Sequence, residues 1–153
     1  MNEAIEARLD RIESQFAIHD LVSDYCHGFD KREWDRFIAI WWKNAIWEIG
    51  PPFGDFAGHE GITHVTRDIL WGAWQASSHF TTNLVIEFDG ADRASGICDV
   101  DCIGTTSDGI AQTISATYRD EYERRNGIWK IILRNVTMHH FSPLPGVSLN
   151  PPE

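Results

Sequence analysis

The sequence predicts an α+β domain, with helices in the first half of the chain and antiparallel strands in the second. Apolar residues recur at helical spacing from Ile5 to Tyr25. Four later runs are rich in β-branched and aromatic residues, at 79–88, 94–103, 110–124 and 128–141. Asn126-Gly127 separates the last two runs, and both residues tolerate the positive φ of a type I′ hairpin. We therefore expect an antiparallel meander that curls around the helical layer.

The individual elements follow from the same periodicities. The first helix is long and amphipathic, with apolar residues spaced four, three and four apart: Ile5, Leu9, Ile12 and Phe16. A second helix is expected after Asp30 and Glu33, which resemble a capping box, with one apolar face: Trp34, Phe37, Ile38 and Trp41. Residues 44–49 predict a short strand that glycines and prolines end, and residues 58–75 predict a third helix. A proline-containing tail is expected to be irregular from about residue 142.

Composition and charge indicate one soluble domain that acts on a small hydrophobic molecule. A chain of 153 residues and 17.4 kDa is within the size of a single domain, so we expect residues 1–153 to share one core. The net charge of -10 argues against nucleic acid or a membrane surface as a partner, because both would repel the protein. No apolar run approaches the roughly 20 residues of a membrane span. The acidic N-terminal segment is unlike a secretory signal, so a cytoplasmic location is expected.

The aromatic, cysteine and histidine residues limit the kinds of site. Seven Trp and eight Phe favour an aromatic-lined pocket, and an aromatic core or subunit interface explains them equally well. Three cysteines cannot all pair, and Cys98 and Cys102 would lie about 13 Å apart along one strand, so we expect Cys26, Cys98 and Cys102 to be reduced. Adjacent strand residues such as His139-His140 point to opposite faces, and no glycine-rich phosphate loop is present. We therefore expect neither a metal nor a cofactor.

Asp30 and His79 are the candidate catalytic residues. A carboxylate that orients an imidazole is a common way to obtain a proton acceptor at neutral pH. Each residue also has a structural alternative. Asp30 is placed to cap the second helix. Strict alternation puts His79 on the side of its strand opposite Phe80 and Leu84, so a catalytic role requires a place at the strand's mouth or a bulge that redirects the side chain.

Four further side chains are candidates for substrate binding: Tyr25, Trp47, Arg134 and Met138. Trp47 alternates with apolar residues, which suits a pocket wall or plain core, and Tyr25 on an amphipathic helix has the same two interpretations. Alternation gives Arg134 an apolar face shared with Ile132, Val136 and Met138. An arginine there must find an anion, either a substrate oxygen or a carboxylate such as Asp101 or Glu87.

Several separated stretches resemble one family. The order of elements is similar to that of the SnoaL-like branch of the nuclear-transport-factor-2-like superfamily, whose fold is a cone-shaped, cystatin-like α+β barrel. Within it, the chain most resembles the hexachlorocyclohexane dehydrochlorinases, in motifs that cover nearly its whole length: Asp30-Lys31-Arg32, Ile40-Trp41-Trp42, Trp47, Thr82-Asn83-Leu84, the hairpin 122–130, Arg134-Asn135 and Phe141-Ser142-Pro143-Leu144.

The resemblance implies a cofactor-independent lyase. It places a catalytic His-Asp dyad on His79 and Asp30, with pocket residues at Trp47 and Arg134, and it implies a homotrimer. Tyr25 stands where the dehydrochlorinases carry a lysine, and a tyrosine there is similar to bile-acid and scytalone dehydratases, so loss of water is an alternative to loss of halide. A ketosteroid-isomerase-like or polyketide-cyclase-like reaction, or a non-catalytic role as a ligand-binding module or dioxygenase small subunit, also remains open.

Overall fold

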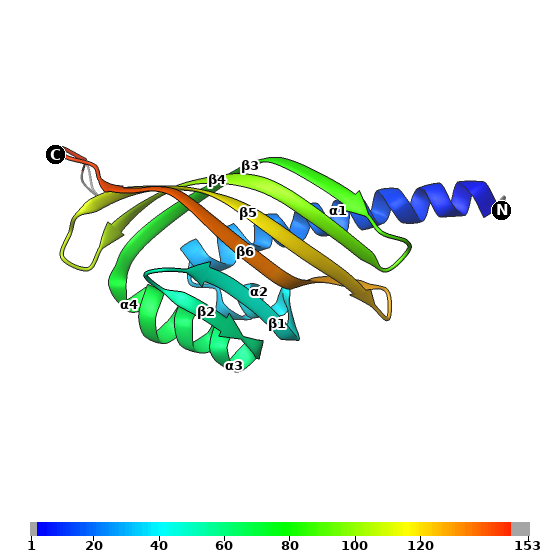
Figure 1. Ribbon diagram of the computed structural model, residues 1–153, viewed down its shortest axis with the longest axis horizontal. Helices are drawn as coiled ribbons and strands as arrows, with labels where there is room; N and C mark the ends of the chain where they lie inside the picture. The colour runs from blue at the N-terminus through cyan, green and yellow to red at the C-terminus, as the bar shows by residue number, and fades with distance from the viewer. Residues whose placement is uncertain (1–2, 148–153) are drawn as a thin grey trace.

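The protein, described here by a computed structural model over residues 3–147, consists of helices packed against one curved six-stranded sheet (Figure 1). The helical segments are α1 (Glu3–Asp30), α2 (Trp34–Ala39), α3 (Gly58–Thr63), the π-helical η1 (His64–Leu70) and α4 (Trp71–Ala73). The strands are β1 (Trp41–Gly50), β2 (Gly54–Ala57), β3 (Trp74–Phe88), β4 (Arg93–Thr106), β5 (Ala111–Arg125) and β6 (Ile128–Pro143). This architecture confirms the predicted α+β class.

The sheet has the order β2-β1-β6-β5-β4-β3, so the last four strands form the expected meander. β1 returns to pair in parallel with β6, and β2 pairs antiparallel with β1 at the edge. The predicted hairpin turn is also present, because Asn126 and Gly127 have φ values of 52° and 80° and join Arg125 to Ile128. The curved sheet thus has a concave face that the helices cover (Figure 1).

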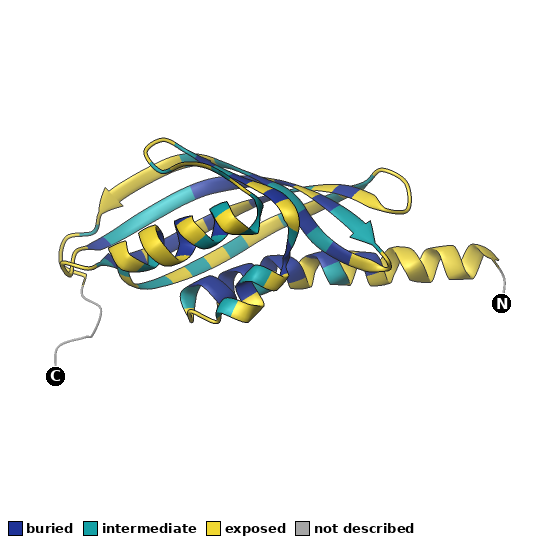
Figure 2. Cartoon of the chain, turned by 90° about the horizontal axis from the view of Figure 1, so that it is seen from below, coloured by how far each residue is buried: buried dark blue, intermediate teal, exposed yellow. Residues whose placement is uncertain are grey.

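Helix α1 is as long as predicted, and its two halves lie in different surroundings. The C-terminal half packs on the sheet and buries Ile18, Leu21 and Tyr25. The N-terminal half extends past the end of the sheet, so its apolar stripe is exposed from Ile5 (47%) to Phe16 (66%) (Figures 1 and 2). The amphipathic pattern therefore predicted the helix correctly, while only its second half covers the core.

Three boundaries differ from the sequence-based expectations. Trp41 begins β1 instead of continuing α2, and its ring is fully buried. The third helix is divided into α3, η1 and α4 and ends at Ala73, because Trp74 already pairs with Thr106 in the sheet. β6 continues to Pro143, and residues 148–153 of the expected irregular tail lie outside the described residues.

The interior is an aromatic core that also forms one wall of a cavity. The Tyr25 ring lies 5.4 to 6.3 Å, centroid to centroid, from five other aromatic residues: Phe29, Phe37, Trp41, Trp47 and Tyr118. Cys26, Cys98 and Cys102 are buried and free, as predicted. None of the helices within residues 3–147 is long and apolar enough to cross a bilayer.

Candidate active site

Asp30 is the last residue of α1, and its carboxylate points to β3. Oδ1 accepts hydrogen bonds from Ser77 Oγ at 2.6 Å and from His79 Nδ1 at 2.6 Å, and Oδ2 accepts one from the His79 backbone N–H at 2.8 Å. The helix-capping alternative is wrong, because α2 begins at Trp34 and its N-cap residue is Glu33, with no side-chain cap bond. Folding therefore brings Asp30 and His79 together across 49 positions of sequence.

A β-bulge turns His79 toward the helices. The pairing of β3 with β4 shifts register between Thr82 and Val85, and Asn83 there has a φ of 58°. The bulge reverses the alternation, so His79 before it and Leu84 after it both face the concave side. Phe80, which strict alternation had placed with Leu84, is instead on the outer face and 60% exposed. Of the two arrangements that would bring His79 to a cavity, a place at the strand's mouth or a bulge, the bulge is therefore present.

The two partners change each other's protonation. Burial alone would raise the pKa of the Asp30 carboxyl, but the hydrogen bonds and charge of His79, with the Ser77 bond, outweigh it and hold that pKa below its ordinary value. Burial alone would lower the pKa of the His79 imidazole, but its hydrogen bonds to Asp30 and Cys102 raise it to about 9. At neutral pH the resting pair is therefore mainly an imidazolium beside a carboxylate.

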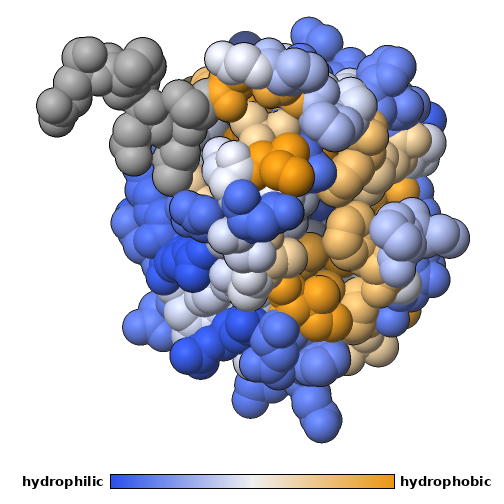
Figure 3. All heavy atoms as spheres, turned by 90° about the vertical axis from the view of Figure 1, so that its left-hand side faces the viewer, coloured by the Kyte–Doolittle hydropathy of each residue, from blue (hydrophilic) through white to orange (hydrophobic). Residues whose placement is uncertain are grey.

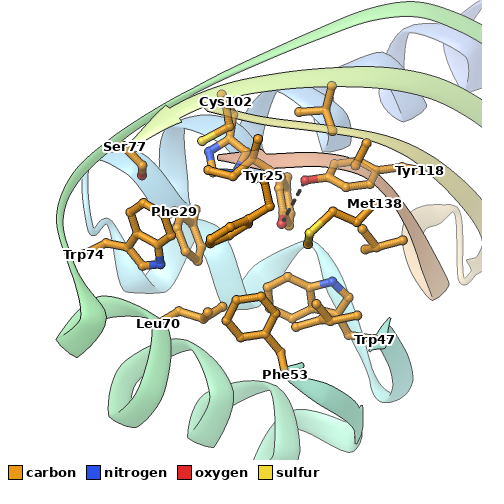
Figure 4. Close-up of a pocket in the computed structure, with 17 residues that line it drawn as sticks. Tyr25, Phe29, Trp47, Phe53, Leu70, Trp74, Ser77, Cys102, Tyr118 and Met138 are labelled. Carbon is orange, nitrogen blue, oxygen red and sulfur yellow. Dashed lines mark hydrogen bonds between the residues drawn. The ribbon is translucent and has the colours of Figure 1, made fainter. Parts of the chain in front are cut away.

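His79 forms part of the wall of an apolar cavity. The cavity lies on the concave side of the sheet (Figure 4). The cavity has an empty volume of about 680 Å³, counting its open mouth. Phe53, Trp74 and Phe141 come from three distant segments and approach one another at this mouth, with Phe141 6.0 to 6.2 Å from the other two ring centroids. Figure 3 faces this end of the molecule, and apolar side chains gather there between hydrophilic ones. The cavity suits a small hydrophobic ligand.

Three of the four predicted substrate-binding residues line this cavity: Tyr25, Trp47 and Met138. Trp47 is 3% exposed, and its indole N–H has no hydrogen-bond partner within residues 3–147, so it is free to donate to a bound acceptor. The hydroxyl of Tyr25 accepts a hydrogen bond from that of Tyr118 at 3.5 Å. Tyr118, Ser77 and Cys102 also line the cavity and were not predicted.

Arg134 does not line the cavity. It is fully buried, and its Nε and Nη2 donate to the two carboxylate oxygens of Asp120 at 2.8 and 2.6 Å. Of the two alternatives, the carboxylate is the one present, but it is Asp120 instead of Asp101 or Glu87. Those two residues lie on β4 and β3, which do not neighbour β6, whereas Asp120 is the directly paired residue of β5. A bulge at Ile132 also places Ile131, instead of Ile132, on the buried face with Arg134.

Metal ligands are not gathered in the part of the chain that the structure describes. Within residues 3–147 no three His, Cys, Asp or Glu side chains are arranged to hold a metal ion. His139 instead lies within 2.9 Å of Thr117 Oγ1 through its Nε2. The side chains with polar atoms that line the cavity thus include an imidazole, hydroxyls, indoles and a thiol.

The fold and this site define a small α+β protein with a partly buried His-Asp pair at an apolar cavity. The chain belongs to the SnoaL-like domain family, whose sequence profile matches residues 10–135. It is 42% identical over 145 residues to hexachlorocyclohexane dehydrochlorinase 1 of Sphingobium indicum strain B90A, covering 94% of each chain. It is 41% identical to gamma-hexachlorocyclohexane dehydrochlorinase of strain UT26, covering 94% of this chain and 92% of that one.

Solved structures agree with this membership. A type 2 hexachlorocyclohexane dehydrochlorinase superposes with a TM-score of 0.89 at 42% identity, covering 95% of this chain and 98% of the other. A putative scytalone dehydratase from Novosphingobium aromaticivorans has a TM-score of 0.79 at 19% identity over 93% of this chain and 95% of its own, so it shares the fold. A protein with a cystatin-like fold from Nostoc punctiforme has a TM-score of 0.69 at 19% identity, covering 82% of this chain and 90% of its own. This likeness confirms the predicted cystatin-like fold.

Proposed function

We propose that this protein catalyses a cofactor-independent elimination on a small hydrophobic cyclic substrate, with His79 as the general base. The observation that carries the proposal is the 2.6 Å contact between His79 Nδ1 and Asp30 Oδ1 at the wall of the apolar cavity. Asp30 occupies Nδ1, so a proton removed from the ligand must go to Nε2. A carboxylate held by three hydrogen bonds keeps the imidazole in one tautomer and orientation.

The proposed reaction transfers one proton to His79, breaks the C–H bond and the bond to the leaving group, and forms one C=C bond. Neutral His79 removes a proton from a carbon next to the carbon that bears the leaving group. The electrons of that C–H bond form the new C=C bond, and the leaving group departs with the electrons of its own bond. His79 becomes an imidazolium, whose charge Asp30 stabilises through the existing hydrogen bond.

Chloride is the first candidate for the leaving group. Two relatives at 41 to 42% identity over most of the chain are named as hexachlorocyclohexane dehydrochlorinases, and chloride needs no proton to depart. Water is a second candidate, favoured by the Tyr25 and Tyr118 hydroxyls at the cavity wall. A departing hydroxide requires a proton, and a phenol can donate one without burying a charge.

The test is a set of substrates offered to the purified protein. Chlorinated cyclohexanes, cyclic alcohols and cyclic enones are incubated separately, and released chloride and product masses are measured. Catalysed release of chloride with formation of an alkene supports dehydrochlorination, and loss of one water from an alcohol supports the second candidate. Conversion of an enone without change of mass would replace elimination with isomerisation, and absence of any catalysed conversion across the set would contradict the proposal.

The rate is expected to rise with pH. His79 must be neutral to accept a proton, and its pKa is raised to about 9, so most of the resting protein at pH 7 is in the wrong protonation state. We expect kcat/KM to increase about tenfold per pH unit below this pKa and to level off above it. The measurement is kcat/KM between pH 6 and 10 with the best substrate. A profile that is flat or falls over this range would exclude His79 as the base.

A further inference from the structure

Tyr25 and Tyr118 form a pair of buried phenols that the proton-transfer chemistry of His79 does not use. Tyr25 comes from α1 and Tyr118 from β5, and they are 2% and 5% exposed. Their hydroxyls lie 3.5 Å apart and point toward one another at the cavity (Figure 4). Within residues 3–147 neither hydroxyl makes another hydrogen bond. Each hydroxyl has one O–H, and the bond between the two hydroxyls uses one of them. The other O–H can therefore donate a hydrogen bond to a ligand.

Arg134 lies directly behind both rings. Its guanidinium carbon is 4.2 Å from the centroid of the Tyr25 ring and 4.3 Å from that of Tyr118. Asp120 fixes the guanidinium in this place by two hydrogen bonds, and Tyr122 in turn donates to Asp120 at 2.7 Å. Nη1 of Arg134 has no partner in the described part of the chain. A fully buried cation is thus held against the two phenols and away from the cavity.

The position of this cation affects the hydroxyls on the other side. Burial raises the pKa of both phenols, so they remain neutral at any working pH, and the charge of Arg134 acts in the opposite direction on both. A neutral donor next to a buried cation gives a stronger hydrogen bond to an acceptor that carries negative charge, because the cation stabilises charge drawn onto the phenol oxygen. Such a donor stabilises charge that develops on a ligand.

The phenol of Tyr25 and the imidazole of His79 are neighbours on the cavity wall. Their ring centroids lie 5.9 Å apart in an edge-to-face contact, and both residues line the cavity. One small cyclic ligand that lies in the cavity against both can therefore direct a C–H bond at the imidazole while an oxygen substituent meets the phenols. Oxygen is the better match for this subsite than chlorine, because a phenol O–H bonds most strongly to a compact oxygen acceptor.

We propose that Tyr25 and Tyr118 form a subsite that donates a hydrogen bond to a partly negative oxygen of a cyclic ligand, such as a phenol or a cyclic ketone, and that the Asp120–Arg134 pair strengthens this bond from behind. Arg134 is then a positioning residue that never touches the ligand. The inference rests on the proposed function in one respect, since the ligand occupies the cavity next to His79. It does not require that the ligand be turned over.

The test is equilibrium binding of two matched probes to the intact protein. 4-Nitrophenol carries a phenol oxygen and its anion absorbs visible light, whereas chlorobenzene has the same ring with no oxygen. The double variant Tyr25→Phe/Tyr118→Phe leaves no O–H in the subsite and is expected to weaken 4-nitrophenol binding by about 10- to 100-fold, the range for a charge-assisted hydrogen bond. Each single variant keeps one phenol O–H and should lose less, and chlorobenzene binding should change by less than about threefold in all three variants. The visible absorption of the bound 4-nitrophenol anion should also be weaker in the tyrosine variants, in parallel with their lower affinity.

Two control proteins separate the subsite from general packing. Thr66→Val removes a buried hydroxyl outside the cavity lining, and we expect less than about a threefold change for either probe. The double variant Arg134→Met/Asp120→Asn replaces the ion pair with a neutral pair, and it should weaken 4-nitrophenol alone. Equal binding of 4-nitrophenol by wild type and the double variant Tyr25→Phe/Tyr118→Phe would place its oxygen elsewhere and overturn the subsite. Equal losses for both probes would assign the tyrosines a packing role and also overturn it. Neither result would affect a chloride-release assay, so the proposed elimination reaction is tested independently of the tyrosine subsite.

Discussion

Replacing His79 with alanine is expected to lower kcat by about 10²- to 10⁴-fold while leaving the protein folded. The side chain makes its main polar contact with Asp30, at the cavity wall. Among the residues of the described chain, 3–147, that line the cavity, His79 is the only histidine, so its removal takes away the only imidazole. The backbone N–H of residue 79 still donates to Asp30 Oδ2, and Ser77 still donates to Oδ1, so the carboxylate keeps two of its three partners. The measurement is turnover of the best substrate, together with thermal unfolding.

The chain provides a matched control for this substitution. His64 and Asp68 form a second His-Asp pair with a 3.0 Å contact, but it lies on the surface of the helical segment, with side chains 58% and 67% exposed. We expect His64→Ala to leave kcat and KM unchanged, because the pair is outside the cavity. Full activity in His79→Ala, with chloride or water still released at the wild-type rate, would end the general-base mechanism.

The fold could be predicted from the sequence because its signals are local. The Asn126-Gly127 turn and the alternating runs on each side set the β5–β6 hairpin without reference to the remainder of the chain. The parallel return of β1 onto β6 and the small strand β2 could not be predicted in this way, since they depend on which edge of the sheet is free. Likewise, helical spacing cannot show that α1 extends beyond the sheet at Phe16.

The site was predicted less completely, for a physical reason that the bulges make clear. Counting from the hairpin turn without a bulge pairs Asp120 with Leu133, whereas the bulge at Ile132 pairs Asp120 with Arg134. One inserted residue thus decided which carboxylate neutralises the buried guanidinium. The bulge at Asn83 decided in the same way that His79 faces the cavity, and no residue type in the sequence requires a bulge at either position.

The second large effect expected is on stability. Arg134→Met should lower the free energy of unfolding by about 3 to 5 kcal/mol, because it leaves the Asp120 carboxylate, 3% exposed, without its cation in the core. Removing both charges avoids this penalty, since a buried ion pair contributes little beyond the cost of desolvating it. The double variant Arg134→Met/Asp120→Asn should therefore recover most of the loss, and the amide oxygen that replaces the carboxylate can still accept from Tyr122.

Urea unfolding at pH 7 measures these differences, and Arg36→Met serves as the surface comparison. Arg36 is paired with Glu33 at 2.8 Å, but its side chain is 43% exposed, so its loss should change the free energy of unfolding by no more than about 1 kcal/mol. The decisive comparison is between the single and double variants. If Arg134→Met and the double variant are equally unstable, the loss comes from the packing of the guanidinium against Tyr25 and Tyr118, and the unpaired charge of Asp120 is not its cause.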